Sequence, residues 1–274
     1  MGEVRPAERD ELALELRAGV AQVDRLDHGV DALDTVVAAL DPAAWATPTP
    51  AVGWDVRDSV AHLAFVEDLA QLALEDPAAY GARRDALLAA GDDTLLLGDG
   101  RRRSGAAVRA WWRAASRATL GDLARRGPRD RVPWFTGSIS AMSFATARLM
   151  ETWAHGQDVR DALGLDPEVS ARLRHVADLG VRTRPFAYET RGHAPNRAPV
   201  RVELTGPDGA RWTWGGPADD VVRGPALDFC LVVTQRIHPA DAGLVVTGTA
   251  AEEWIGIAQA FAGAPTDHRP RRAG

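Results

Sequence analysis

Residues 150–158 read METWAHGQD, and they lie within a predicted helix over residues 138–163. The helix is expected to stop at Gly164, because glycine commonly terminates helices. Glu151 and His155 are four positions apart, so their side chains share one face of the helix, with Cβ atoms ~6 Å apart. Two side chains placed in this way can converge on one metal ion.

A third ligand has to come from another helix, and His62 is the candidate. It lies in a helix predicted over residues 55–75, which Asp55 is expected to cap with Asp58 in the first turn. Apolar side chains share its face of that helix, so it is expected to point into the interior: Phe65, Val66 and Leu69. Two histidines and one carboxylate leave coordination positions open, which is typical of catalytic metal sites. Spacing alone also fits a structural core histidine and a surface Glu–His pair, which are the commoner occurrences.

Asp158 lies three positions after His155, where its carboxylate can orient the imidazole as a second-shell partner of the ion. Arg57, near the start of its helix, is a candidate contact for an anionic substrate or a thiol cofactor. The arginines at 101–103 are a candidate lid over an acidic substrate, although a charged loop beside glycines is usually just exposed to solvent.

Two further helices are predicted over residues 7–40 and 105–126, both with apolar residues at helical spacing. Residues 76–104 are expected to form short helical stretches, and residues 128–137 a loop. Four long helices with varied connectors predict a four-helix bundle over residues 1–165.

The second half of the chain, residues 166–274, changes character. The pattern predicts a smaller α+β domain, so the whole chain is assigned to the α+β class. Its elements are expected to be helices at 168–183, 224–236 and 250–262, a hairpin of strands at 200–204 and 211–214, and a strand at 244–247.

Composition excludes several kinds of protein. All 32 basic residues are arginine, which excludes a lysine Schiff base and a phosphate-binding loop of the Gly-Lys-Ser/Thr type. The net charge of −6, with arginines spread along the chain, argues against a nucleic-acid partner. No run approaches the ~20 apolar residues of a membrane helix, so neither a membrane partner nor an anchor is expected. We expect a cytoplasmic protein whose partner is a small-molecule substrate, and the sequence leaves the oligomeric state unknown.

The only cysteine, Cys230, precludes an internal disulfide and fits a reducing compartment. Its apolar neighbours predict a small buried side chain and a poor nucleophile. Any thiol used in chemistry is therefore expected to come from outside the protein.

The N-terminal half resembles the DinB-like superfamily. The motifs that carry this resemblance are GWDVRD (residues 53–58) followed by His62-Leu63, and ETWAHGQD (residues 151–158). The branch most similar to this chain contains mycothiol-dependent maleylpyruvate isomerase. The resemblance implies a divalent metal, usually zinc, held by His62, Glu151 and His155, and a low-molecular-weight thiol such as mycothiol as cofactor.

The C-terminal half resembles an actinobacterial family of metal-binding proteins that pairs such a bundle with a domain labelled wyosine-formation-like. The shared motifs are RTRPFAY (182–188), WTWG (212–215), GPALDFC (224–230) and AQAFAG (258–263). The helix–strand pattern of this domain also resembles sterol-carrier-like folds. The family resemblance covers nearly the whole chain and concerns fold and metal, and it implies no particular reaction.

Three functions follow as hypotheses. The leading one is a metal-dependent enzyme in which a metal-bound thiol of the mycothiol kind serves transfer or isomerisation on a small electrophile. An alternative is a hydrolase that uses metal-bound water. Another is a non-catalytic protein with a structural metal, which predicts an apolar ligand pocket in the C-terminal domain, remote from the metal. A role in tRNA modification, suggested only by the domain label, ranks last.

Overall fold

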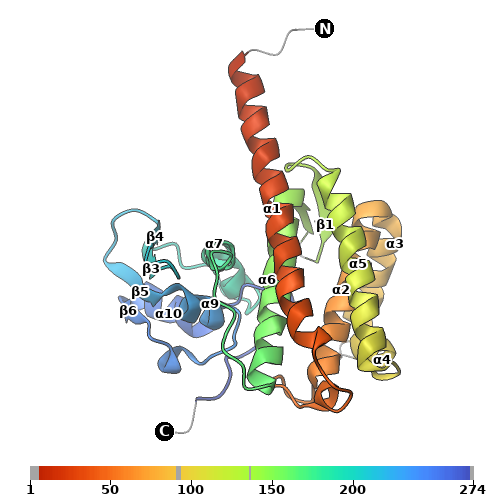
Figure 1. Cartoon of the computed structure of the whole chain (residues 1–274). Coiled ribbons are helices and arrows are strands. Elements are labelled where there is room, and N and C mark those ends of the chain that lie inside the picture. Colours follow the sequence, from red (N-terminus) through yellow and green to blue (C-terminus); the bar gives the residue numbers. More distant parts are fainter. Residues whose placement is uncertain (1–5, 91–93, 136, 272–274) are drawn as a thin grey trace. The chain divides into compact units, whose positions relative to one another are not determined.

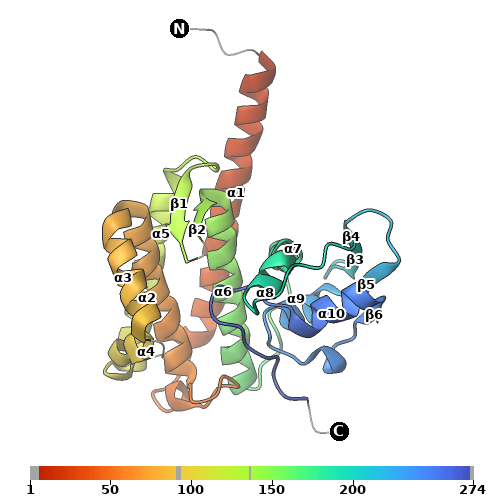
Figure 2. The ribbon, with the colours of Figure 1, turned by 180° about the vertical axis from the view of Figure 1, so that it is seen from behind.

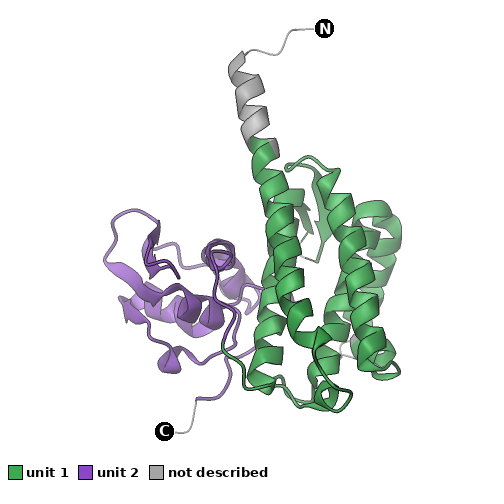
Figure 3. Ribbon diagram, viewed as in Figure 1, with its two compact units in different colours: residues 1–166 green, residues 167–274 purple. Residues whose placement is uncertain are grey.

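The computed structural model describes residues 6–90, 94–135 and 137–271. The chain divides into two compact units, Met1–Asp166 and Pro167–Gly274 (Figure 3). The first is mainly helical and the second mixes helices with a sheet, which confirms the predicted α+β class. Within the described residues, no helix combines the length and the apolar character that crossing a lipid bilayer requires.

A four-helix bundle forms the body of unit 1 (Figures 1 and 2). Helix α1 packs against α5 and α6, and α2 packs against the same two helices. The bounds are α1 Pro6–Ala38, α2 Val56–Glu75, α5 Gly105–Ala124 and α6 Ala141–Ala162. The connector between α2 and α5 contains two helices that both contact α2, namely α3 Pro77–Ala90 and α4 Thr94–Arg101, and a short 3₁₀ helix, η1 (Ala44–Ala46), precedes α2.

Apolar side chains at helical spacing close the bundle. On α1 the apolar residues that are at most 4% exposed are Leu26, Val30, Leu33 and Val37. Burying each such side chain stabilises the fold by about 1.5–3 kcal/mol. A β-carbon added to Gly29 would lie 3.1 Å from Cδ1 of Leu149, so a glycine lets α1 come close to α6. The consequence for the site is that α6 is held firmly between α1 and α2.

The prediction of a loop over residues 128–137 was wrong in part. This segment contains strand β1 (Arg131–Trp134), which pairs antiparallel with β2 (Gly137–Ser140). The helix expected from residue 138 therefore starts at Ala141, because Ser138–Ser140 are needed for the hairpin. Its N-terminus is capped by the Ser140 hydroxyl, which accepts a hydrogen bond of 3.1 Å from the Ser143 amide.

Unit 2 contains a four-stranded sheet in the order β4-β3-β5-β6, with β3 and β5 parallel and the other pairs antiparallel. The strands are β3 Val200–Thr205, β4 Arg211–Trp214, β5 Asp220–Pro225 and β6 Val245–Thr247. The helices are α7 Leu173–Arg182, α8 Arg184–Glu189, α9 Ala226–Val233 and α10 Thr249–Ile257, and a short 3₁₀ helix, η2, spans Pro239–Asp241. The predicted hairpin of β3 and β4 is confirmed, whereas α8 and β5 were not predicted.

Several predicted helix bounds in unit 2 were wrong, and the helix expected to reach residue 236 ends at Val233. The helix expected from residue 168 begins at Leu173. The helix expected from residue 224 begins at Ala226, since Gly224 and Pro225 complete β5 beside Leu204 and Thr205. The last helix, expected to reach residue 262, ends at Ile257. After it the chain turns extended at Ala258, and the Ala260 amide donates to the Val233 carbonyl at 2.8 Å, which draws this segment to the end of α9.

Candidate metal centre

The start of α2 is fixed by a capping box. The Asp55 carboxylate accepts a hydrogen bond from the Asp58 amide at 2.8 Å, and the Asp58 carboxylate accepts from the Asp55 amide at 3.3 Å. Two unpaired amides at the helix end are thereby satisfied, as the sequence predicts for these residues. His62 lies in the second turn of the helix that begins here, so its position along the bundle depends on this cap.

Helices α2 and α6 bring His62, Glu151 and His155 together. The Glu151 Oε2 atom lies 3.5 Å from Nε2 of His155 and 3.9 Å from Nε2 of His62. The donor atoms of the three side chains all lie within 4.8 Å of one another. Among the residues that the structure describes, no other group of three His, Cys, Asp or Glu side chains converges in this way.

The donor set and its spacing fit a divalent ion. Zinc–ligand bonds of about 2.0–2.1 Å in tetrahedral geometry imply donor–donor distances of about 3.3 Å. The separation between Glu151 and His155 is already close to that value, and that between Glu151 and His62 exceeds it by a few tenths of an ångström. Two imidazoles and one carboxylate suit zinc, iron, nickel or manganese, and they leave positions open for a further ligand.

The other nitrogen of His155 faces Asp158. The distance from Nδ1 of His155 to Oδ2 of Asp158 is 3.3 Å, and the Asp158 side chain is 1% exposed. A carboxylate at Nδ1 fixes the tautomer that leaves Nε2 available as a donor to a metal. The distance is compatible with an orienting role for Asp158, which stays a prediction.

The electrostatic surroundings favour the ligand-competent forms. Burial, and then the charge of His155, lower the pKa of His62, so its imidazole stays neutral at neutral pH. Burial by itself would raise the pKa of Glu151. Hydrogen bonds from His155 and His62 outweigh that effect and hold this pKa well below its usual range. A neutral imidazole and an ionised carboxylate are the forms that bind metals.

Trp54 is a neighbour of the site that the sequence analysis missed. Its ring is nearly parallel to that of His155, with centroids 5.8 Å apart and an interplanar angle of 11°. It also contacts the ring of His62 at 5.3 Å with an angle of 53°. The available signal was its place immediately before the N-cap Asp55, in the motif that carries the family resemblance.

A buried charge on α6 was missed as well. The Arg148 side chain lies over the Trp134 ring, 5.3 Å from its centroid, and is 2% exposed. It is one helical turn before Glu151 and faces the bundle interior together with buried Glu67, whose pKa is raised by burial. Its charge contributes to lowering the pKa of both His62 and Glu151.

Arg57, the candidate contact for a substrate or cofactor, has a partner nearby in the chain. Arg57 Nη2 lies 3.2 Å from Asp55 Oδ2, and Arg57 is about 140° around the helix from His62 at 100° per residue. Its assignment to a cofactor stays a prediction.

The arginines at 101–103 each have a separate local partner, and their role as a lid stays a prediction. Arg101 binds Asp58, Arg102 pairs with Asp99, and Arg103 lies over the Trp111 ring at 4.8 Å.

Cys230 is buried in unit 2, and its thiol donates to the Leu173 carbonyl at 3.3 Å. Burial raises the pKa of this thiol well above its usual value, which makes it a poor nucleophile, as expected.

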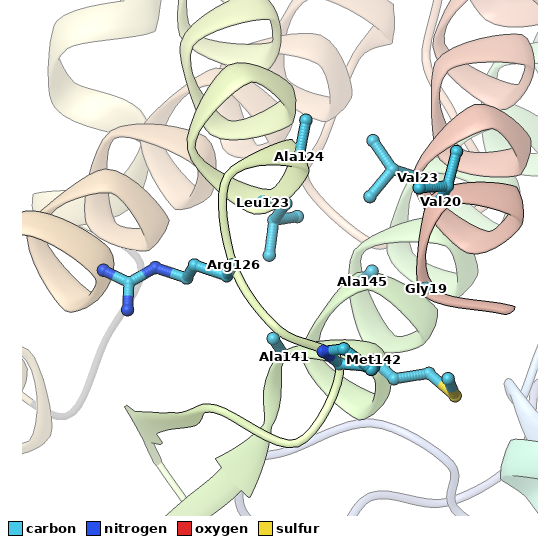
Figure 4. A pocket seen from close by; sticks show the side chains of 10 residues that line it. Gly19, Val20, Val23, Leu123, Ala124, Arg126, Ala141, Met142 and Ala145 are labelled. Carbon is cyan, nitrogen blue, oxygen red and sulfur yellow. The ribbon is translucent and has the colours of Figure 1, made fainter. Parts of the chain in front are cut away.

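A hollow of about 80 Å³ lies between α1, α5 and α6 in unit 1 (Figure 4). Arg126 is its one charged lining residue, and this guanidinium donates to the Leu74 carbonyl. The described residues that line the hollow include no histidine and no carboxylate, so it offers no chemistry of its own.

Unit 2 has a larger, apolar pocket of about 460 Å³. It lies where the parallel strands β3 and β5 end, a place where ligands often bind in sheets that contain parallel strands. The residues that line it carry no charge: Val169, Leu173, Thr205, Gly206, Pro207, Gly224, Pro225, Ala226 and Leu227.

Comparisons with known proteins agree on the bundle. Residues 26–160 match the family model described as mycothiol maleylpyruvate isomerase N-terminal domain. The chain is 40% identical over 241 residues to uncharacterised proteins from two strains of Mycobacterium tuberculosis, which covers 86% of this chain and 93% of theirs. The crystal structure of the mycothiol-dependent maleylpyruvate isomerase is similar with a TM-score of 0.55 at 14% identity, over 82% of this chain and 91% of that one. A histidine-to-alanine mutant of that enzyme gives a TM-score of 0.52 at 15% identity, with the same coverage.

Proposed function

Because this chain belongs to the mycothiol maleylpyruvate isomerase-like family of the DinB-like superfamily, we propose that it is a metal-dependent enzyme that uses an external low-molecular-weight thiol. The proposed reaction is transfer or isomerisation on a small electrophile. The observation that carries the proposal is the convergence of His62, Glu151 and His155 in a bundle of this family.

The three side chains would hold the ion through Nε2 of each histidine and an oxygen of Glu151. When bound, a divalent ion such as zinc supplies Lewis acidity that lowers the pKa of a thiol brought to it. Asp158 would keep the His155 Nδ1 proton in place, so that Nε2 faces Glu151. The apolar packing of α2 and α6 excludes water from behind the ligands, which strengthens their interaction with a cation.

The need for an external thiol is supported by Cys230. This is the only cysteine of the chain, it is buried, and its raised pKa keeps it protonated. A small thiol such as mycothiol is the cofactor that the family relationship favours. We further propose Arg57 as a contact for that cofactor.

Calorimetry tests the thiol part of this proposal. Zinc-loaded protein and its metal-free form are titrated with mycothiol, and with a methylthioether analogue that has no ionisable sulfur. Binding of mycothiol to the loaded form only, and weaker binding of the analogue, is the expected result. The variant Cys230→Ser serves as a control that should bind as the parent does. Equal binding of thiol and thioether would favour the hydrolase alternative, in which water is the nucleophile.

The pocket of unit 2 favours a second candidate function. Its size and apolar lining suit a small lipophilic ligand, which is what a non-catalytic binding protein with a structural metal would carry. Native mass spectrometry of the purified protein separates the two functions. A co-purified apolar molecule, lost in Leu173→Arg and retained in His155→Ala, would support the binding protein.

A further inference from the structure

We propose that Trp54 is a positioning residue that sets the orientation of the two histidines of the metal centre, and that Arg101 acts through it. This inference rests on the proposed metal centre. It assigns a role to Trp54 of the GWDVRD motif and to the first arginine of the run at 101–103, neither of which has so far been given a role in the site.

The two imidazoles differ in what lies at their second nitrogen. A carboxylate oxygen of Asp158 lies 3.3 Å from Nδ1 of His155. The Nδ1 atom of His62 is buried and makes no hydrogen bond among the described residues. Metal-binding histidines usually donate this second nitrogen to a carboxylate, carbonyl or water, which holds the ring in place. For His62 the protein has to supply that restraint by another route.

Aromatic packing supplies the restraint. The His62 ring contacts the Trp54 ring at 5.3 Å and the His155 ring at 4.5 Å, with interplanar angles of 53° and 49°. Trp54 also stacks on His155, so the three rings contact one another. One indole therefore contacts both histidines, and such aromatic contacts favour particular ring orientations.

The turn that carries Trp54 is itself held in place. The Trp54 carbonyl accepts hydrogen bonds from the Thr49 amide at 2.8 Å and the Thr49 hydroxyl at 3.1 Å, and the Trp54 amide donates to the Ala51 carbonyl at 3.0 Å. Gly53 has a φ angle of +79°, which side-chain-bearing residues rarely adopt. The indole is thus presented from a backbone with little freedom.

Arg101 ties this turn to α4. Its Nη2 atom donates to the Gly53 carbonyl at 3.0 Å and to Asp58 Oδ2 at 2.8 Å, and its Nε donates to Asp58 Oδ1 at 3.0 Å. One guanidinium therefore holds both Gly53, the residue before Trp54, and Asp58, a member of the capping box of α2. Bidentate pairing of this kind fixes geometry as well as adding energy. Loss of Arg101 should loosen the turn and, through Trp54, the histidines.

Cobalt titration tests the proposal, because Co²⁺ occupies zinc-type sites and its visible absorption reports ligand geometry. The parent, Trp54→Phe, Trp54→Ala, Arg101→Gln and Arg102→Gln are titrated with Co²⁺, and circular dichroism checks that each is folded. Arg102 is the matched control, since it is the adjacent arginine and pairs with exposed Asp99.

We expect Trp54→Ala to bind Co²⁺ about 10-fold more weakly with an altered spectrum, on the scale of losing a partner that orients a ligand. Trp54→Phe keeps a ring and should stay within about 3-fold of the parent. Arg101→Gln should fall between them, and Arg102→Gln should match the parent. If Trp54→Ala does not fold, the proposal is tested by comparing the Co²⁺ affinity and spectrum of Arg101→Gln with those of Arg102→Gln.

Two results overturn the inference. Parent-like affinity and spectrum in both Trp54→Ala and Arg101→Gln would remove the positioning role and leave the metal centre intact. A parent that takes up no Co²⁺ would remove the metal centre and, with it, this inference.

Discussion

The Nδ1 atom of His155 lies 3.3 Å from Oδ2 of Asp158, one turn further along α6. The same imidazole presents Nε2 to Glu151 at 3.5 Å. The His155 ring therefore lies between two carboxylates. That of Glu151 is partly exposed, and that of Asp158 is almost fully buried. In the proposed metal centre, this arrangement would orient Nε2 of His155 toward the ion.

Asp158→Asn tests that relationship. The substitution keeps the shape of the side chain and removes its charge, so we expect metal affinity to fall about 10- to 100-fold while the protein stays folded. Competition with a chromophoric chelator measures the affinity. Asp161→Asn, at an exposed position on the same helix, is the control and should bind as the parent does. An Asp158→Asn variant with unchanged affinity would deny Asp158 a role in metal binding.

The contact between α4 and α2 depends on Gly100. A β-carbon added there would lie 2.2 Å from Cβ of Ala61, which cannot be accommodated without moving a helix. We expect Gly100→Ala to destabilise the fold by about 1–3 kcal/mol, the usual cost of overpacking. Denaturant unfolding measures it.

Gly98→Ala is the matched control for this substitution, because the nearest atom to its added β-carbon is the flexible end of Arg102, at 3.7 Å. It should leave stability unchanged or raise it slightly, since alanine favours helix over glycine. Equal stability of the two variants would show that α4 does not pack on α2 in this way.

The hydrogen bonds of Glu203 with two arginines predict that the stability of unit 2 depends on pH. Its carboxylate accepts hydrogen bonds from Arg201 at 2.5 Å and Arg223 at 2.7 Å, and these lower its pKa to about 2 from 4.5. Because the folded pKa is depressed, the stabilisation is fully present above about pH 4.5 and is lost as the pH falls toward 2.

Thermal unfolding of Glu203→Gln from pH 7 to pH 2 tests this dependence. The melting temperature should lie below that of the parent at neutral pH, and the difference should shrink as the pH falls through this window. Glu252→Gln, at an exposed site on α10, should track the parent throughout. A difference that stays constant with pH would mean that the ion pairs do not stabilise the fold.

Local signals in the sequence predicted the features that depend on near neighbours. The capping box of Asp55 and Asp58 and the shared face of Glu151 and His155 follow from spacings of three and four residues. His62 approaches that face from another helix, and it lies 89 positions before Glu151 in the chain. Spacing along one helix cannot predict such a contact. The apolar neighbours of His62 on its own helix made it the candidate, and the family resemblance added support.

The missed features depend on distant partners. Strand β5 is short and ends in Gly224-Pro225, which reads as a breaker, and its extended form depends on parallel pairing with β3. The β1–β2 hairpin contains Pro133, which a central strand does not tolerate but an isolated pair does. The place of Trp54 beside the histidines was not predicted, because its turn is held by Arg101, 47 positions later in the chain.

Metal content is the measurement that tests the central claim most directly. Untagged parent protein, His155→Ala and the control His193→Ala, at an exposed histidine of unit 2, are analysed by elemental mass spectrometry. The account predicts about one divalent metal ion per chain in the parent and in His193→Ala, and a loss of most of it in His155→Ala. A parent that stays metal-free after reconstitution with zinc, iron, nickel and manganese, or a His155→Ala variant that keeps its full metal content, would contradict it.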